Sequence, residues 1–441
     1  MTQKQALDIL KLGKNVFLTG AAGSGKTYVL NQYIKYLKEN EINVGVTAST
    51  GIAATHMNGK TIHSWAHIGI KERLTNSDLA HIFNRREFRN SIAEAKVLII
   101  DEVSMLHHYR LDMVDAVLQK MHGNNKPFGG IQVVLCGDLF QLPPISRSGD
   151  SEYVTESNVW QNMDIKICYL SEQYRHEDEK LSQLLNEMRS GEVSEESTEN
   201  LLKQKSSEFS NQTATKLYTH NIDVDELNLK ELAKLNGDTK KFVMTQKGDK
   251  TISKAMIKNC LAPEELELKK GATVMFVQNN YSKGYVNGTI GIIKKFDLDG
   301  MPVVRTLSGK EITSSIGSWK VEEGENVLAE INQIPLRLAW AITVHKSQGM
   351  TLDSAQIDLS KSFVPGMGYV ALSRVKKLKD IFLLGINNKA FFVSPKVIEL
   401  DQLLRNKSKA HQKEITSLSD QEIEKGHDEF LYGLSYAGKL L

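Results

Sequence analysis

The sequence predicts an α/β protein made of two parallel-sheet domains, with a small antiparallel barrel inserted into the second domain and a helical tail at the C-terminus. Short apolar runs such as residues 15–19 and 43–49 alternate with stretches of helical periodicity, which is the pattern of a doubly wound parallel sheet. Residues 240–330 instead contain short strands separated by Asn-Gly, Asp-Gly and Ser-Gly turns, which predicts antiparallel hairpins. A chain of 441 residues is also too long for a single ordinary core.

Composition excludes several classes of protein. The chain is 41% hydrophobic and 24% charged, as globular proteins are, and its net charge of +2 neither requires nor excludes a nucleic-acid partner. The three cysteines, Cys136, Cys168 and Cys260, form no C-x-x-C pair, which argues against a zinc ribbon or a disulfide framework, and Cys136 is expected to be a small core residue. No signal peptide is recognisable and no apolar stretch approaches about 18 residues, so we expect a cytoplasmic protein without a membrane partner.

A glycine-rich loop between a predicted strand and a predicted helix indicates a nucleotide site. Residues 20–27 fit the phosphate-binding pattern G-x-x-x-x-G-K-[S/T], after the apolar run 15–19 and before the helical periodicity that starts at Lys26. The Lys26 ammonium suits the β- and γ-phosphates, and the Thr27 hydroxyl suits Mg²⁺. The residues expected to contact the nucleotide here are Gly20, Ala21, Ala22, Gly23, Ser24, Gly25, Lys26 and Thr27.

Two further strand ends carry side chains that a nucleoside triphosphatase needs. The apolar run 96–100 ends in Asp101 and Glu102, of which the first suits the Mg²⁺ shell and the second can polarise the attacking water. The run 131–136 leads into a proline-stiffened loop that carries Gln141, which can sense the γ-phosphate or orient the water. Together with the phosphate loop these residues predict an active ATP site at the carboxyl ends of the strands.

Polar residues after the second strand suggest a phosphate contact of another kind. The small hydroxyl side chains of Ser49 and Thr50 stand at a strand end and a helix start, where they suit the phosphates of a nucleotide or of a nucleic-acid backbone. His63 and Trp65 follow on a predicted loop, either as a stacking pair for bases or, for His63, as an ordinary surface histidine.

The second α/β domain is expected to begin near residue 165. Its predicted strands and helices are 166–170, 217–221, 334–343, 354–359, 368–374 and 381–386, with the loop 344–349 among them. The expected domain bounds are 1–164 for the first domain, with a small insertion at about 55–75, then 165–245 and 326–395 for the second, 246–325 for the barrel and 396–441 for the tail. An apolar patch at residues 430–434 has no partner that the sequence indicates.

The order of these pieces resembles the superfamily 1 DNA helicases of the PIF-one family and, more distantly, RecD-like helicases. The similar segments cover about residues 1–395 and read GAAGSGKT, VTASTGIAA, TIHSW, IIDEVSM, PFGGIQVVLCGDLFQLPPI, LSEQYR, IPLRLAWAITVHKSQG and GYVALSRVKK. The resemblance implies two RecA-like lobes with a small insertion in the first and an SH3-like barrel in the second. It also implies ATP-driven 5′-to-3′ movement on single-stranded DNA, and this direction rests on the resemblance alone.

The resemblance also implies a role for individual residues. On the nucleotide side it implies adenine contact by Gln3, metal and base roles for Asp101 and Glu102, and γ-phosphate contact by Gln141, with further contacts from Gln348 and Gly349. Arg175 and Arg374 become the arginines that the second lobe offers to the transition state. The residues implied to contact DNA are Ser49, Thr50, His63, Pro144, His345 and Ser347.

We therefore expect a monomeric, ATP- and Mg²⁺-dependent DNA helicase that acts on single strands and their junctions with duplexes, such as forks, R-loops or G-quadruplexes. A translocase with weak strand separation stays open, as does a phosphate-loop scaffold or loader-like subunit of a repair complex. The complete set of catalytic side chains argues against the scaffold. A phosphate-loop kinase is rejected because it would not need two α/β lobes, with arginines in two distant motifs.

Overall fold

The computed structural model divides the chain into two compact units, which we call the first lobe (Met1–Arg175 with Ser394–Leu441) and the second lobe (His176–Val393). The structure describes residues 1–437 except 58, 70, 145–151, 175–177, 206–214, 220–221, 279, 281, 286, 307–308 and 324–325. None of the helices in these ranges has the length and apolar character that a membrane span requires.

The first lobe is built on a parallel sheet of six strands in the order β3-β2-β4-β5-β1-β6. The strands are β1 (Asn15–Gly20), β2 (Val44–Ala48), β3 (Lys60–Thr61), β4 (Val97–Asp101), β5 (Gln132–Cys136) and β6 (Ile165–Leu170). This confirms the parallel α/β prediction for the lobe. The predicted boundary at residue 165 was wrong, because β6 pairs with β1 along its whole length, from Asn15–Ile165 to Gly20–Leu170. A buried strand looks the same in sequence whichever sheet it joins.

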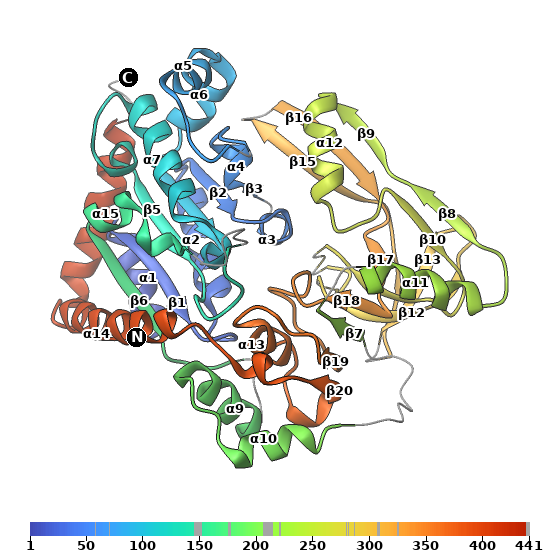
Figure 1. The fold of residues 1–441 in the computed structure, drawn as a ribbon. Helices are drawn as coiled ribbons and strands as arrows, with labels where there is room; N and C mark the ends of the chain where they lie inside the picture. The colour runs from blue at the N-terminus through green and yellow to red at the C-terminus, as the bar shows by residue number, and fades with distance from the viewer. Residues whose placement is uncertain are drawn as a thin grey trace. The chain divides into compact units, whose positions relative to one another are not determined.

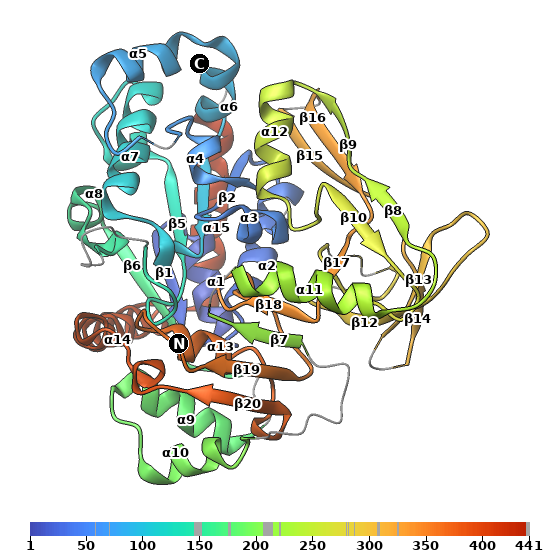
Figure 2. The same cartoon turned by 45° about the vertical axis from the view of Figure 1, so that its right-hand side comes forward.

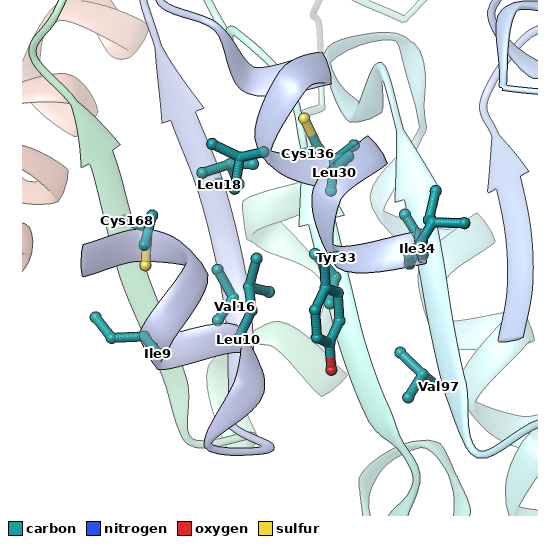
Figure 3. Packing of buried hydrophobic residues seen from close by; sticks show 14 of the residues in the cluster. Ile9, Leu10, Val16, Leu18, Leu30, Tyr33, Ile34, Val97, Cys136 and Cys168 are labelled. Atoms are coloured by element: carbon teal, nitrogen blue, oxygen red, sulfur yellow. The ribbon is translucent and has the colours of Figure 1, made fainter. Parts of the chain in front are cut away.

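Helices cover this sheet and complete its core. The apolar stripes of α1 (Gln3–Lys11) and α2 (Lys26–Glu39) pack on β1 and its neighbours, and Figure 3 shows Leu10, Val16 and Leu30 among the buried side chains. The Tyr33 hydroxyl, buried in this core, donates to Gln132 Oε1 at 2.6 Å. On the way from β3 to β5 the chain forms α4 (Ile62–Trp65), α5 (Asn76–Asn84), α6 (Arg86–Ala93) and α7 (His108–His122).

The C-terminal helices belong to the first lobe. Figure 1 shows α14 (Pro395–Thr416) and α15 (Asp420–Ala437) in red beside β6 and α1. Along the edge strand β6, the backbone N–H groups of Ile167 and Tyr169 donate to His411 Nδ1 at 2.9 Å and to Ser408 Oγ at 3.0 Å. These side chains occupy donors that an exposed sheet edge would leave open. The tail is therefore a structural part of this lobe.

The apolar patch near the C-terminus packs against the turn after α1. Gly13 has a φ of +73°, and a Cβ there would lie 2.2 Å from Cδ2 of Phe430. At Gly426 on α15, a Cβ would lie 2.4 Å from Cδ2 of Leu12. Both glycines permit a close approach that a larger residue would block.

The second lobe contains a smaller parallel sheet in the order β18-β7-β19-β20 (Figure 2). These strands are β7 (Thr215–Tyr218), β18 (Ala341–Thr343), β19 (Ala355–Leu359) and β20 (Ile381–Ile386), and the helices of this part are α9 (Glu179–Ser190), α10 (Glu195–Leu202), α11 (Ile222–Lys234) and α13 (Met367–Leu372). The strand predicted at 334–343 is two strands: β17 (Leu336–Leu338) pairs antiparallel with β11, and β18 pairs parallel with β7. The chain changes sheets between them.

An antiparallel region interrupts this lobe, as predicted. Its strands are β8 (Lys240–Val243), β9 (Thr245–Gly248), β10 (Glu265–Leu268), β11 (Thr273–Phe276), β12 (Ile290–Phe296), β13 (Pro302–Thr306), β14 (Glu311–Thr313), β15 (Gly317–Glu323), β16 (Asn326–Gln333) and β17, with the helix α12 (Lys250–Asn259). The described strands pair as a five-stranded sheet β14-β13-β12-β11-β17 and as the smaller sheets β15-β16-β9 and β10-β8. The region thus runs from β8 to β17 and extends on both sides of the expected bounds 246–325.

Candidate ATP site and DNA interface

The phosphate loop joins β1 to α2 with a backbone that only glycine adopts readily. Gly20, Gly23 and Gly25 have φ angles of 149°, 86° and 87°, and α2 begins at Lys26. A Cβ at Gly25 would lie 1.9 Å from Gln3 Nε2. The Gln3 side chain therefore packs closely against the loop. The backbone N–H groups in the first turn of α2 form an anion site.

The Lys26 ammonium is held by the loop itself. Its Nζ donates to the carbonyls of Gly20 at 2.8 Å and Ala21 at 3.1 Å. Thr27, at the first turn of α2, is exposed. Lys26 thus stands beside the place of a phosphate and has to exchange these two carbonyls for phosphate oxygens when a nucleotide binds.

Gln3 and an aromatic residue that the sequence reasoning missed lie beside the loop. Gln3 Nε2 donates to the Ser24 carbonyl at 3.3 Å, and the backbone N–H of Tyr174 donates to the Gly23 carbonyl at 3.0 Å. The Tyr174 side chain is 60% exposed. An exposed ring fixed beside a nucleotide loop is suited to stack on a base. The signal for it was its position directly before Arg175, a residue that lies outside the described residues.

Asp101 is the last residue of β4 and Glu102 follows it, so the strand ends in the Asp-Glu pair as predicted. Asp101 is 9% exposed, and its Oδ1 accepts the N–H of Glu102 at 2.8 Å. Burial raises the pKa of the Asp101 carboxyl, while hydrogen bonds from Cys136 and Glu102 and the charge of Lys26 oppose that rise. Cys136 is therefore more than the core residue that we expected, because its thiol contacts the Asp101 carboxylate.

Glu102 has a strained backbone that a serine from the neighbouring strand holds. Its φ of 53° and ψ of 44° are left-handed, a conformation that costs a residue other than glycine about 1–3 kcal/mol. The Ser49 hydroxyl donates to the Glu102 carbonyl at 2.6 Å. The Ser49 N–H donates to the Asp101 carbonyl at 3.0 Å. Ser49, which we expected on the DNA side, is thus bonded to the Asp-Glu turn.

Gln141 is buried next to the end of β5. Its side chain is 6% exposed, and its Oε1 is buried without a hydrogen-bond partner among the described residues. A buried carbonyl oxygen without a donor is costly, so it fits a group that receives a donor from a ligand or a water.

The other DNA candidates of the first lobe differ in exposure. Thr50 Oγ1 accepts the N–H of Ala53 at 3.2 Å in the first turn of α3 (Gly51–His56). His63 lies on α4 rather than on a loop, and burial, with the charges of Arg110 and His107, lowers its pKa to about 4. Pro144 is buried.

Trp65 does not stack on bases as we had considered, because its side chain is only 6% exposed. A Cβ at Gly45 on β2 would lie 2.7 Å from the Trp65 ring, so the ring packs on the strand. The short helix α4 turns this side chain inward, and the sequence could not show that contact because it joins two separate elements.

Arg374 in the second lobe is turned inward and is only 1% exposed. Its Nε donates to the Val370 carbonyl at 2.8 Å and its Nη2 to Ser373 Oγ at 2.8 Å. Its Nη1 reaches the carbonyls of Ser347 and Met350, each at 3.3 Å. The guanidinium therefore binds the loop 344–349 from inside the lobe.

That loop carries the remaining candidates. Ser347 is fully buried, and its hydroxyl donates to the Val344 carbonyl at 2.7 Å. His345 is half-buried, Gln348 is buried, and Gly349 is exposed with a φ of 78°. The exposed part of the loop thus lies on either side of the buried Ser347.

Comparison with known proteins identifies the family. A family model described as PIF1-like helicase matches residues 2–199, and one described as DNA helicase Pif1, 2B domain, matches residues 254–296. The ATP-dependent DNA helicase Pif1 of Psychrobacter sp. (strain PRwf-1) is 41% identical, over 98% of this chain and 75% of the relative. The chain belongs to the PIF1-like helicase family.

Solved structures of Pif1 helicases agree with that assignment. Bacteroides sp. Pif1 in complex with ADP-AlF4 has a TM-score of 0.80 and 31% identity, covering 92% of this chain and 96% of the other. Bacteroides Pif1 bound to single-stranded DNA has a TM-score of 0.65 and 30% identity, covering 93% and 97%. With its nucleotide loop and its Asp-Glu turn, this PIF1-like chain is an ATP-dependent DNA helicase.

The donor set of this PIF1-like site fits Mg²⁺ bound through a nucleotide. The described residues contain no group of three His, Cys, Asp or Glu side chains that could hold a metal ion by themselves. Mg²⁺ usually keeps several waters and is held by one or two protein oxygens together with phosphates. The Asp101 carboxylate and the Thr27 hydroxyl fit that requirement, since one is a buried carboxylate and the other an exposed oxygen beside the phosphate loop.

The sequence also did not indicate two neighbouring cations, Arg337 on β17 and Lys346 within the loop 344–349. Among the described residues the Nε of Arg337, on β17, is buried without a hydrogen-bond partner. Burial lowers the pKa of Arg337, and burial together with the charge of Arg337 lowers that of Lys346, while Asp225 opposes both shifts. Two neighbouring, partly desolvated cations favour an anion. No sequence motif indicates this pair, because Arg337 lies on β17 and Lys346 lies in the loop after β18.

Proposed function

We propose that this helicase uses ATP and Mg²⁺ to move 5′-to-3′ along single-stranded DNA and to separate duplex or structured DNA ahead of it. The observation that carries the proposal is the bond between Ser49 and Glu102, because it joins the expected strand contact to the expected catalytic glutamate within one lobe. The direction of movement rests on membership of the family.

The first lobe supplies the groups for hydrolysis. In the proposed reaction water attacks the γ-phosphorus, Glu102 accepts its proton, and ADP leaves as the β–γ bridging bond breaks. Gln141 orients the water through its buried amide oxygen. Lys26 stabilises the charge on the β- and γ-phosphates. Thr27 and Asp101 would hold Mg²⁺, which would neutralise more of that charge.

The base of the nucleotide is proposed to lie beside Gln3 and Tyr174. The amide of Gln3 is fixed against the Ser24 carbonyl and offers its remaining groups to the edge of adenine. The exposed ring of Tyr174 offers a face for stacking. Gln348 and Gly349 are proposed as further nucleotide contacts.

The two arginines are proposed to stabilise the transition state. Arg175 and Arg374 would place positive charge on the γ-phosphate as negative charge develops there. Arg374 must first exchange its bonds to Val370 and Ser373 for bonds to phosphate. Hydrolysis is therefore expected to be slow until the loop that Arg374 binds has moved.

The DNA strand is proposed to contact both lobes through its phosphates. The contacts are Ser49, Thr50, His63 and Pro144 on the first lobe and His345 and Ser347 on the second, with Arg337 and Lys346 as an additional cationic pair. Because His63 is neutral near pH 7, its contact is a hydrogen bond rather than an ion pair. The protein is proposed to act as a cytoplasmic monomer on forks, R-loops or G-quadruplexes.

A strand-displacement assay tests this function. Duplexes that carry only a 5′ or only a 3′ single-stranded tail are incubated with ATP and Mg²⁺, and K26A serves as the control without turnover. We expect opening of the 5′-tailed duplex alone. Opening of the 3′-tailed duplex would contradict the polarity, and DNA-stimulated ATP hydrolysis without strand separation would indicate a translocase.

A further inference from the structure

We infer that the Ser49 hydroxyl is a switch that donates either to the Glu102 carbonyl or to a phosphate of the bound strand, and so couples the strand to the catalytic glutamate. The inference deepens the proposed function and rests on it. Ser49 is in this sense a positioning residue, because it acts on hydrolysis through the backbone of Glu102.

The geometry around Ser49 is set by the pairing of two strands. Ala48 at the end of β2 is in register with Asp101 at the end of β4. The next residue, Ser49, donates its N–H to the Asp101 carbonyl at 3.0 Å and its hydroxyl to the Glu102 carbonyl at 2.6 Å. One residue therefore holds two consecutive carbonyls of the Asp-Glu turn.

The chemistry of the hydroxyl makes its two partners mutually exclusive. A serine hydroxyl has one proton, and a carbonyl and a phosphate oxygen can only accept it. While Ser49 donates to Glu102, it cannot donate to the strand. Thr50 differs in this respect, because its bond with Ala53 uses a lone pair of Oγ1 and leaves the hydroxyl proton for a phosphate. A strand bound at Thr50 thus brings a competing acceptor next to Ser49.

Release of the Glu102 carbonyl matters because the bond from Ser49 helps to hold the backbone conformation of Glu102. Glu102 is left-handed, and the 3-10 turn Val103–Met105 follows it directly. Such a conformation persists when surrounding bonds impose it. When a phosphate takes the proton of Ser49, the turn loses one of these bonds, and the Glu102 side chain gains freedom to reach the attacking water. Without a bound strand the protein is therefore held in a state that hydrolyses ATP slowly.

ATP turnover with and without the strand tests the switch. In S49A, kcat without DNA is expected to rise about two- to tenfold, which corresponds to the loss of one net hydrogen bond. At saturating oligo-dT kcat should match that of the parent protein, so the stimulation factor falls by the same ratio while the KM for oligo-dT rises. S49T keeps the hydroxyl and should restore most of the stimulation.

Thr47 on the same strand provides a matched control. Its buried hydroxyl donates to the Ile99 carbonyl at 2.7 Å, a bond of the same kind between the same two strands. T47V removes that bond without touching the Asp-Glu turn, so it should lower stability and leave the stimulation factor of the parent unchanged.

Three results would overturn the inference. An unchanged stimulation factor in S49A with only a higher KM for oligo-dT would make Ser49 a simple phosphate ligand. A lower kcat both with and without DNA would mean that the bond supports the active state. A parent protein that oligo-dT does not stimulate would overturn the proposed function as well, whereas the first two results leave that function intact.

Discussion

In each lobe a serine proposed to contact the strand is hydrogen-bonded to a residue proposed to act in catalysis, but the two bonds run in opposite directions. In the first lobe the side chain of Ser49 binds the backbone of Glu102, whereas in the second the side chain of Arg374 binds the backbone of Ser347. The first is a single hydrogen bond from a hydroxyl group, whose proton another acceptor can take. The second belongs to a guanidinium with four recorded partners in the interior of its lobe. The single hydrogen bond of Ser49 is therefore easier to exchange than the buried set of hydrogen bonds made by Arg374.

The largest effect is expected from removal of either proposed transition-state arginine, Arg374 or Arg175. An arginine that stabilises the transition state of phosphoryl transfer contributes about 10³–10⁵ in turnover. R374A and R175A should therefore bind ATP with modest change and lose most hydrolysis, measured as steady-state kcat and as nucleotide affinity. Turnover within about threefold of the parent, far below that range, would make the arginine structural.

Arg189 provides the control for Arg374. It is a second buried arginine of the same lobe, 5% exposed, whose Nη1 donates to the Tyr369 hydroxyl at 2.9 Å. R189K should lower the unfolding temperature without a comparable loss of turnover. Equal losses of turnover in R189K and R374A would show that both changes act through the fold.

Removal of the proposed general base, Glu102, is expected to have the next largest effect. General base catalysis contributes about 10²–10⁴ in rate, so E102Q should bind ATP and nearly stop hydrolysing it, because an amide cannot accept the proton. D112N is a suitable control, since Asp112 Oδ1 accepts the N–H of Val159 at 2.9 Å and serves the fold of the lobe. Near-normal hydrolysis by E102Q would assign the base to another residue.

The hydrogen bonds between α14 and β6 should affect stability rather than turnover. S408A removes the acceptor for the Tyr169 N–H, so it should lower the free energy of unfolding by about 1–3 kcal/mol, the penalty for a buried unpaired donor. S417A, on the exposed end of the same helix, should change it by less than about 0.5 kcal/mol. Equal decreases in the free energy of unfolding of S408A and S417A in chemical denaturation would show that the bond between Ser408 and Tyr169 does not stabilise this lobe.

How much of this could be predicted from the sequence depended on how local each feature is. The place of the phosphate loop between β1 and α2 was predicted because its glycines, Lys26 and Thr27 are adjacent in the chain. The bond from Ser49 to Glu102 was not, because it requires the register of β2 on β4. The place of β6 in the first sheet was missed because it depends on pairing with β1, which is distant in the sequence. The inward turn of Arg374 depends likewise on packing, which a motif does not encode.

The smallest effect is expected from the charge of His63. Its pKa of about 4 lies below its ordinary value of 6.5, so unfolding takes up a proton between these values. Its contribution to stability is therefore present above pH 6.5 and is lost as the pH falls toward 4. H63Q should leave the pH profile of strand affinity between about pH 7 and 8 unchanged. A profile that flattens in H63Q would show a charged histidine at the strand.

The coupling of strand and nucleotide is tested most directly by measuring both sides of it in the parent protein. Steady-state ATP hydrolysis is followed with and without oligo-dT, and oligo-dT affinity is measured with and without a non-hydrolysable ATP analogue. We expect slow hydrolysis without DNA, strong stimulation by the strand, and a strand affinity that the nucleotide changes, as linkage requires. Equal hydrolysis in both cases, with strand affinity indifferent to nucleotide, would contradict the coupling in both lobes.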